Sequence, residues 1–467
     1  MGLELVFERM DILTFEVLML LRFARFIICM LVFSTGLDAQ EFAFTFQVNG
    51  EQAGLMLPQP LTSSFRTVSF WMKPGVDWDS TLQSDVPILV KDKFYPNSNW
   101  GGRFQIYIQE GHLKWTMADY DNTGGSTIES DRNSWDADVW YHLAFAIEQN
   151  SGMKMYVNGI LQQDTDPRDL LPPPPVEGAD ESFYFGSWGS TMQGQPDATI
   201  DEVRFWNSAR TQAEIRTNMC QRVNCTAGVR ANFSFNNNNS GGLREDCNLY
   251  SALLTGTSTN PHVIRSTAPL GDFSFQKYKS SWVNEGFVRL PNRDTVKLSD
   301  IRLPGGEGIH IYANNQFPEK RAGIPDTVVE FDVMFGVWCT DISGQYDLGV
   351  GMPRRKNNAR GDCDDCTYIF NRDVHYTNWN RRPETSQLCQ FNLNDESGFG
   401  KSWREEYLVV DELYFTPKLP DTVAICSNSG GNINAFYLNG ASYTWSDGVV
   451  GSGRSVNSSG MLWVEME

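Results

Sequence analysis

Short runs in which apolar and polar residues alternate recur along the chain, separated by clusters of Gly, Asn and Pro. In residues 67–75, TVSFWMKPG, the apolar residues Val68, Phe70 and Met72 stand at every second position before a Pro-Gly pair. A period of two that ends in Pro-Gly predicts a half-buried strand followed by a turn.

Residues 140–164, WYHLAFAIEQNSGMKMYVNGILQQD, carry the same alternation over a longer distance. This stretch predicts two strands joined around residues 150–152. A second tight turn is expected at Asn158-Gly159, because this dipeptide best accepts the positive φ angles of a type I′ hairpin.

Residues 200–215, IDEVRFWNSARTQAEI, predict a further strand followed by a short helix. Thr211 and Glu214 have the T-x-x-E spacing of a capping box, which opens a helix. Within the strand, strict alternation places Asp201 on the same face as Val203 and Phe205. An aspartate on an apolar face requires either hydrogen bonds or a metal ion, so both roles stay open for Asp201.

These patterns favour an all-β fold, and a chain of 467 residues is longer than one hydrophobic core usually supports. The 40 glycines, 21 prolines and 13% aromatic residues agree with sandwiches joined by turns rather than helical bundles. We therefore expect several β domains in succession.

Three stretches, TVSFWMKP, WYHLAFAIEQNSGMKMYVNGILQQD and IDEVRFWNSARTQAEI, occur in the order and spacing of a laminin G-like, concanavalin A-like domain. The resemblance covers residues 40–225 and implies a jelly-roll sandwich that binds glycans or proteins, often with calcium at the sheet rim. The family's usual F-D-G-x-x-D-Y near the start is here FQVNGEQAGLML, so Asn49 and Glu51 stand where aspartates are usual.

The remaining chain divides into three predicted parts. Residues 226–269 resemble the connector that completes or trails this jelly roll in Bacteroidetes proteins. Residues 270–418 contain alternating strands and resemble a module of large secreted Bacteroidetes proteins, which implies a second β-sandwich that acts as a structural spacer. Residues 419–467 carry YTWSDG and a later SSG, resembling a partial immunoglobulin-like repeat of gliding and adhesin proteins, and this resemblance implies type IX secretion. The end at residue 467 also suggests a fragment or a truncated gene.

The first 39 residues have the features of a signal peptide. From Met19, the expected start, two arginines precede an apolar stretch at 26–33 and a small-residue end at Leu37-Asp38-Ala39. Cleavage is expected before Gln40, since the apolar stretch is too short to span a bilayer as an anchor. The mature chain is then secreted or held on the outer cell surface, with no membrane span after cleavage.

The formal net charge is -19, from 57 acidic and 38 basic residues. Such a chain lacks the basic stripe that neutralises phosphates, so nucleic acid is excluded as a partner. An acidic surface is compatible with divalent cations, and calcium is the cofactor that the sequence suggests.

Four oxygen-bearing residues on segments expected to meet at one rim of the jelly roll are candidate calcium ligands. Calcium takes six to eight oxygen ligands, so the set is incomplete by itself. The alternative for Asp201 is a hydrogen-bonding role in a neighbouring turn. The four candidates are Asp201, Asp197, Asn49 and Glu51.

Eight cysteines remain after signal cleavage, an even number that favours disulfides in an oxidising compartment. The spacing of Cys220 and Cys225 in CQRVNC allows a small closed loop. Cys363 and Cys366 also have zinc-knuckle spacing, with Cys389 and His375 to complete four ligands, but secretion favours disulfides. The disulfide candidates are Cys220, Cys225, Cys247, Cys339, Cys363, Cys366, Cys389 and Cys426.

Tryptophans beside glycine and asparagine are the candidate ligand-binding residues. Such residues stack on sugar rings and hydrogen-bond their hydroxyls, and Trp100 with Asn99 in YPNSNWGGRF and Trp188 in GSWGS lie in predicted loops. For catalysis, the chain has no E-x-D-x-x-E run, no G-x-S-x-G and no H-E-x-x-H. The sequence thus predicts a non-catalytic adhesion or carbohydrate-binding protein whose partner is a glycan or a surface protein. The alternative is a fragment, or an accessory binding module, of a polysaccharide-degrading enzyme.

Overall fold

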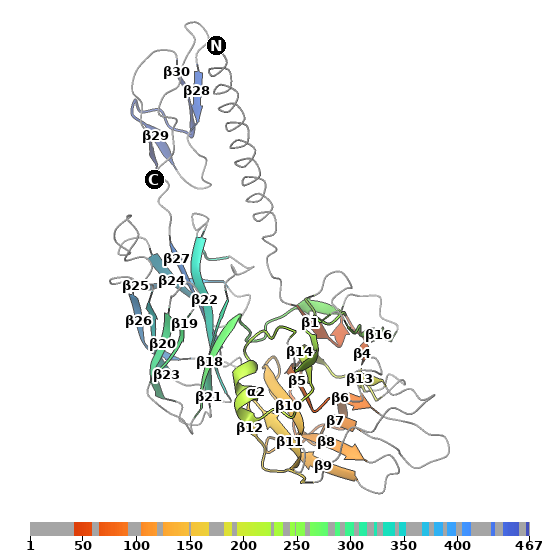
Figure 1. Ribbon diagram of the computed structural model, residues 1–467. Coiled ribbons are helices and arrows are strands. Elements are labelled where there is room, and N and C mark those ends of the chain that lie inside the picture. Colours follow the sequence, from red (N-terminus) through yellow and green to blue (C-terminus); the bar gives the residue numbers. More distant parts are fainter. Residues whose placement is uncertain are drawn as a thin grey trace, which may run out of the picture. The chain divides into compact units, whose positions relative to one another are not determined.

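Strands account for nearly all regular structure, which confirms the all-β prediction (Figure 1). The computed structural model describes residues 42–57, 65–91, 104–118, 125–148, 151–167, 182–188, 194–225, 228–236, 243–247, 249–256, 262–278, 285–289, 295–302, 308–314, 322–324, 330–340, 345–351, 367–372, 378–385, 390–397, 404–411, 431–434, 442–456 and 464–466. The predicted signal peptide lies outside these residues. Residues 41–467 form one compact unit.

The first sheet of the jelly roll has eight strands within the described residues. Its order is β12 (Ile160–Leu161), β11 (Gly152–Val157), β10 (Tyr141–Glu148), β5 (Thr67–Pro74), β14 (Ala198–Trp206), β1 (Phe42–Thr45) and β17 (Val263–Arg265), and β15 (Val229–Phe233) also pairs with β14. All of its pairings are antiparallel.

The second sheet of the jelly roll has seven antiparallel strands in the described part of the chain. Its order is β16 (Leu253–Thr255), β4 (Gly54–Leu57), β13 (Phe183–Phe185), β6 (Val86–Lys91), β7 (Phe104–Gln109), β8 (His112–Ala118) and β9 (Gly125–Glu129). The inner faces of the two sheets form one apolar core, in which Phe65 contacts Phe104, Phe183 and Phe205 edge-on at 5.3–5.7 Å between ring centroids. The segment 226–269 supplies β15, β16 and β17, so it completes both sheets.

Local turn chemistry follows the sequence closely. Asn158 and Gly159 take φ angles of 51° and 71° in the turn between β11 and β12, as expected for a type I′ hairpin. The helix α2 (Gln212–Asn218) begins with the predicted capping box, in which Thr211 and Glu214 each bond the other's backbone N–H. Among the described residues, no helix is long and apolar enough to cross a membrane.

The predicted alternation in β14 is wrong at one position. Asp201 pairs with Trp71 but Arg204 pairs with Ser69, so the register shifts between them, and Glu202 takes a φ of 50°. This β-bulge inserts one extra residue and changes the phase of the alternation. Val203 therefore faces the core together with Ile200 and Phe205, while Asp201 and Arg204 face outward beside Trp71.

A second sandwich follows and has its own apolar core. Its described strands form a six-stranded sheet, β18 (Phe273–Tyr278), β21 (Gly308–Asn314), β22 (Glu330–Cys339), β27 (Arg404–Asp411), β24 (Thr367–Arg372) and β25 (Asn380–Thr385), and a four-stranded sheet, β19 (Glu285–Arg289), β20 (Thr295–Arg302), β23 (Gln345–Gly351) and β26 (Gln390–Ser397). Side chains of both sheets, such as Phe335, Val337 and Leu348, meet in this core.

Three pairs of short strands complete the described structure. They are β2 (Gln47–Val48) with β3 (Glu51–Gln52), β28 (Gly431–Asn434) with β30 (Gly453–Val456), and β29 (Tyr443–Trp445) with β31 (Val464–Met466). In the YTWSDG segment, Tyr443 and Trp445 are buried, and the Trp445 indole donates to the carbonyl of Gly451 at 2.8 Å. The immunoglobulin-like nature of this part stays a prediction, as do the exact domain boundaries.

Candidate functional site

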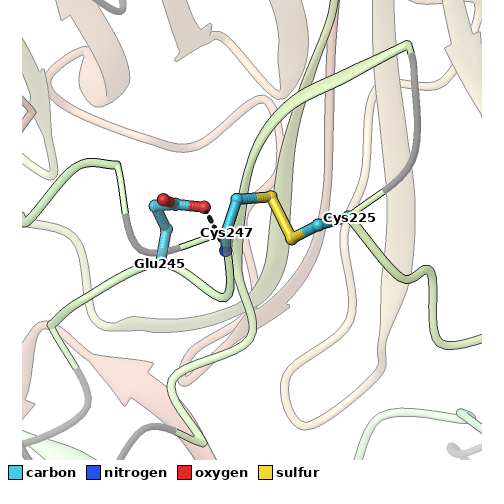
Figure 2. A group of neighbouring side chains, drawn as sticks. All are labelled: Cys225, Glu245 and Cys247. Atoms are coloured by element: carbon cyan, nitrogen blue, oxygen red, sulfur yellow. Dashed lines mark hydrogen bonds between the residues drawn. A yellow bond between two sulfur atoms is a disulfide. The ribbon is translucent and has the colours of Figure 1, made fainter.

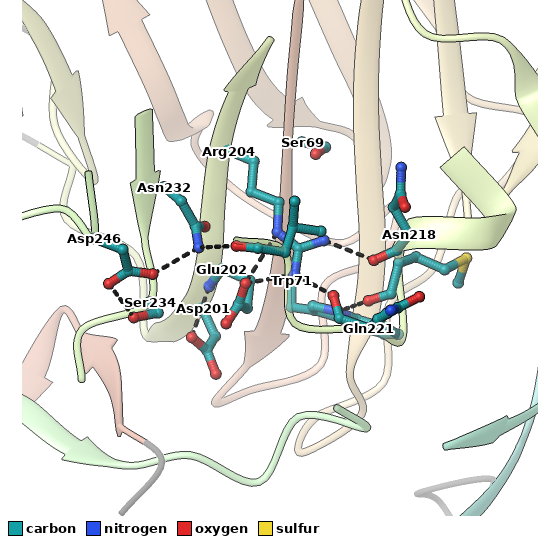
Figure 3. A network of polar contacts seen from close by, with 12 residues as sticks. Ser69, Trp71, Asp201, Glu202, Arg204, Asn218, Gln221, Asn232, Ser234 and Asp246 are labelled. Carbon is teal, nitrogen blue, oxygen red and sulfur yellow. Dashed lines mark hydrogen bonds and ion pairs between the residues drawn. The ribbon is translucent and has the colours of Figure 1, made fainter. Parts of the chain in front are cut away.

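The outward face of the eight-stranded sheet carries a buried network of charged side chains (Figure 3). Arg204 and Glu202, 1% and 3% exposed, form an ion pair with Nη2 and Oε2 2.5 Å apart. Arg204 also donates to the carbonyl oxygens of Asn218 and Gln221, each at 2.7 Å. One guanidinium thus ties the bulge of β14 to the end of α2 and the turn after it.

Asp201 takes the hydrogen-bonding role that the sequence left open for it. Its carboxylate accepts a hydrogen bond from the Ser266 hydroxyl and one of 2.6 Å from the backbone N–H of Glu202. Burial and the neighbouring Glu202 carboxylate raise the pKa of Asp201 well above its ordinary value. Asp201 therefore lies in a closed, hydrogen-bonded position rather than on an open rim.

The other three calcium candidates lie on separate turns and strands. Asp197 precedes β14 and is half-buried, Asn49 is exposed in the turn between β2 and β3, and Glu51 is half-buried on β3. Asn49 takes a φ of 52° before Gly50, which gives it a structural role as a turn residue. Within the described residues, Asp201, Asp197 and Glu51 do not bring three carboxylates within 4.8 Å of one another. Calcium binding at these residues stays a prediction.

A second polar cluster continues the network toward β15. Asp246 accepts hydrogen bonds of 2.7 Å from Asn232 Nδ2 and from the Ser234 hydroxyl. Although part of Asp246 is exposed, its carboxylate lies in a desolvated position, and this desolvation raises its pKa to about 6. The neighbouring Glu245 is fully buried.

The one described group of three potential metal ligands is Cys225, Glu245 and Cys247 (Figure 2). Cys225 and Cys247 form a disulfide that closes 22 residues, so their sulfurs are not thiolate ligands. Glu245 instead accepts backbone hydrogen bonds from Cys247 at 2.7 Å and from Tyr250 at 3.1 Å. The group is a cross-linked turn rather than a metal site.

This disulfide corrects the small loop that the sequence suggested, because Cys225 bonds Cys247 and not Cys220. Cys220 and Cys339 are buried thiols. The remaining disulfide candidates, Cys363, Cys366, Cys389 and Cys426, lie outside the described residues.

On β7, β8 and β9, half-buried and exposed polar side chains, with one aromatic pair, lie on the outward face of the seven-stranded sheet. Toward β13 the same face is buried, at Tyr184, Val90 and Gln105. The ring of Trp188 lies 5.7 Å from that of Tyr107 on β7, centroid to centroid. Beside this pair, the Tyr107 and Thr116 hydroxyls are 3.4 Å apart, and the Thr116 and Thr127 hydroxyls 2.8 Å apart. An aromatic surface bordered by hydroxyls is the combination that binds sugars. The other two ligand candidates, Asn99 and Trp100, lie outside the described residues.

The two outward faces of the jelly roll differ sharply in exposure. On the eight-stranded sheet, Trp71 and His142 are 0% and 3% exposed, and Trp71 packs against Trp338 of the second sandwich. On the seven-stranded sheet, Thr127 and Glu129 are exposed, and Tyr107 is half-buried. The described side chains of β8 and β9 on the second face are therefore open to a large ligand, whereas the region around Trp71 on the first face is not.

Comparison with known proteins agrees with this architecture. Residues 49–216 match the Laminin_G_3 family model, described as the concanavalin A-like lectin/glucanases superfamily. The jelly roll is therefore similar to laminin G/concanavalin A-like domains over these residues. No curated protein matches the chain.

Several solved structures are similar to parts of this chain at low sequence identity. A Bacteroides ovatus structure named for carbohydrate binding is 17% identical, with a TM-score of 0.36, over 50% of this chain and 62% of that one. A heptameric SAP-like pentraxin from Limulus polyphemus is 14% identical, with a TM-score of 0.28, over 39% and 83%. The binding domain of botulinum neurotoxin DC in complex with SialylT is 11% identical, with a TM-score of 0.28, over 80% and 86%. This chain thus spans less than two thirds of the Bacteroides ovatus structure.

Proposed function

We propose that this chain is a secreted or cell-surface, non-catalytic carbohydrate-binding protein that contributes to adhesion. The outward face of the seven-stranded sheet contacts the glycan, and the second sandwich supports the jelly roll. The observation that carries this proposal is the Trp188–Tyr107 pair beside the hydroxyls of Thr116 and Thr127, on the face that remains accessible. The match of residues 49–216 to a lectin/glucanase superfamily supports the same class of ligand.

The buried carboxylates of the jelly roll support the non-catalytic part of the proposal. Glycoside hydrolysis needs two carboxyl groups that flank one substrate bond in an open site. Asp201 and Glu202 are 1% and 3% exposed, and Glu202 is already paired with Arg204, so neither can reach a polysaccharide. An assay for release of reducing sugar from bound polysaccharide tests the enzyme alternative directly.

Replacing Trp188 by alanine is expected to weaken glycan binding at least about 10-fold, because one stacked aromatic commonly dominates a small contact. A glycan array identifies the ligand, and calorimetry on the best hit measures the change. Leu249→Ala, which removes a 70% exposed apolar side chain from the turn that Glu245 organises, is the control and should bind normally. Equal loss in both variants, or no loss in Trp188→Ala, would contradict the proposed face.

Calcium at the three remaining candidates, Asp197, Asn49 and Glu51, is a separate part of the proposal. We expect added EDTA to lower the affinity for the same glycan, because a rim calcium orders the loops that carry its ligands. Binding that is identical with and without EDTA would remove calcium while leaving the glycan face intact.

A further inference from the structure

Two buried histidines meet where the jelly roll contacts the second sandwich. His142 on β10 lies edge-on to Trp71 at 5.2 Å, and Trp71 lies edge-on to Trp338 on β22 at the same distance. His310 on β21 is 5.5 Å from Trp338, again between ring centroids. We name His142, Trp71, Trp338, His310 and Tyr278 the module contact.

Tyr278 on β18 links the two sides of the module contact. Its hydroxyl donates to the carbonyl oxygen of Asn158 at 3.0 Å, and the same oxygen lies 2.8 Å from Nε2 of His310. Because the hydroxyl proton points to Asn158, we infer that Nε2 of His310 carries the ring proton. A neutral His310 satisfies this geometry.

The contact leaves polar atoms of both histidines without partners. Nδ1 of His142 and Nδ1 of His310 are buried and have no hydrogen-bond partner among the described residues, and the same holds for Nε1 of Trp338. A buried imidazolium needs an acceptor for each ring N–H. Protonation of either ring would therefore bury an N–H that nothing in the contact accepts.

The charged groups that face the histidines also oppose protonation. Arg204 on β14 and His310 face His142, and Arg216 on α2 faces His310, with its guanidinium 3.6 Å above the Tyr278 ring. Burial, followed by these positive charges, lowers the pKa of His142 well below its ordinary value and that of His310 to about 3.

The nearby carboxylates are already engaged. Glu202 is paired with Arg204, and Glu214 with Arg210 at 3.1 Å. Asp201 accepts a hydrogen bond from Ser266, and both residues belong to the jelly roll, so separation of the two sandwiches does not break this bond. The raised pKa values of Asp201 and Asp246 act in the opposite direction, because protonation of these carboxyl groups favours the folded jelly roll as pH falls.

A small recess borders His142. It is about 10 Å³, space for one water molecule at most, and lies between α2 and the outward face of the eight-stranded sheet. His142, Ser69, Arg204, Arg210 and Glu214 are among its lining residues. A recess of this size does not hydrate the ring, so His142 takes up its proton as the contact opens.

We propose that the module contact is an acid-sensitive switch, closed while His142 and His310 are neutral and released when they take up protons. The switch would let the second sandwich separate from the jelly roll in an acidic environment while both sandwiches stay folded. It concerns the outward face of the eight-stranded sheet, so it is independent of the proposed glycan face.

The sign of the pH effect follows from proton linkage. A histidine whose pKa is lower in the closed state binds protons more readily in the open state, so closure is fully favoured above about pH 6.5 and is lost as the pH falls below that value. For His310 alone, with a pKa of about 3 when closed, the shift toward the open state between pH 8 and pH 5.5 is about 10-fold. His142 adds to this shift in the same direction.

Hydroxyl-radical footprinting of the full chain tests the switch. Trp71 and Trp338 are 0% and 1% exposed, and both become accessible only if the contact opens, whereas Trp115 in the jelly-roll core serves as an internal reference. Between pH 8 and pH 5.5, oxidation of Trp71 and Trp338 relative to Trp115 should rise about 10-fold or more. Unchanged relative oxidation would overturn the proposal.

Variants separate the histidines from general acid effects. The double variant His142→Gln/His310→Gln stays neutral, so its footprint should be the same at both pH values. His112→Gln on β8, outside the module contact, should open like the wild type. If the double variant does not fold, NMR titration of the wild-type histidines tests the switch instead. Protonation of both rings near pH 6.5 while Trp71 and Trp338 stay protected from oxidation would refute it.

Discussion

Replacing Arg204 by methionine is expected to lower the free energy of unfolding of the jelly roll by about 3–5 kcal/mol, the range found when one partner of a buried ion pair is removed. Arg204 is 1% exposed, and its loss leaves the buried Glu202 carboxylate without its cation. It also leaves the carbonyl oxygens of Asn218 and Gln221 without their donor. Guanidinium unfolding followed by circular dichroism measures the change.

Two comparisons make this result specific to the buried pair. Arg210→Met breaks the ion pair with Glu214, whose side chain is 44% exposed, and should cost no more than about 1 kcal/mol. The double variant Glu202→Met/Arg204→Met removes both charges and should recover a large part of the lost stability. If Arg204→Met costs as little as Arg210→Met, the network in Figure 3 does not hold the bulge to α2.

Signals confined to a few neighbouring residues were sufficient to predict the local structure. The Asn158-Gly159 turn and the Thr211–Glu214 capping box form as expected, because the energies involved arise within four residues of the chain. The all-β fold likewise follows from repeated alternation along the strands, whereas the jelly roll was implied by the resemblance of three stretches to laminin G-like domains.

The bulge at Glu202 could not be read from the same pattern. Ile200, Val203 and Phe205 are the core residues, a spacing that violates strict alternation and becomes intelligible only against the register of β5. A bulge is a property of two paired strands, and one strand's sequence does not contain its partner's register. This is why strict alternation predicts Asp201 on the apolar face, whereas the paired strands place it outward.

The candidate sites also depend on contacts between residues far apart in the chain, which the sequence pattern does not predict. His142 and His310 are both polar residues within strands, yet their importance depends on the packing of Trp71 against Trp338 across two sandwiches. The glycine beside Trp188 correctly indicates a tryptophan that is not fully buried. The contact of Trp188 with Tyr107, however, arises only when the strands pair into the sheet. Burial and pairing of distant residues are tertiary properties that periodicity does not encode.

Removal of the Cys225–Cys247 disulfide is expected to lower the free energy of unfolding by about 3 kcal/mol, because the bond closes 22 residues and limits the entropy of the unfolded chain. The bond joins Cys225, which follows α2, to Cys247 in the turn that Glu245 organises. The segment between the two cysteines includes β15. The sequence left the pairing open among eight cysteines, since spacing alone does not fix connectivity.

The double variant Cys225→Ser/Cys247→Ser, compared with the oxidised wild type in guanidinium, measures this contribution. Any other disulfide of the chain is present in both proteins and cancels in this comparison. Because Glu245 bonds the backbone of Cys247 and Tyr250 independently of the sulfurs, the native turn should persist in the variant, with glycan binding retained. A double variant as stable as the wild type would show that this cross-link does not limit the unfolded chain, and lost glycan binding would place the turn within the ligand surface.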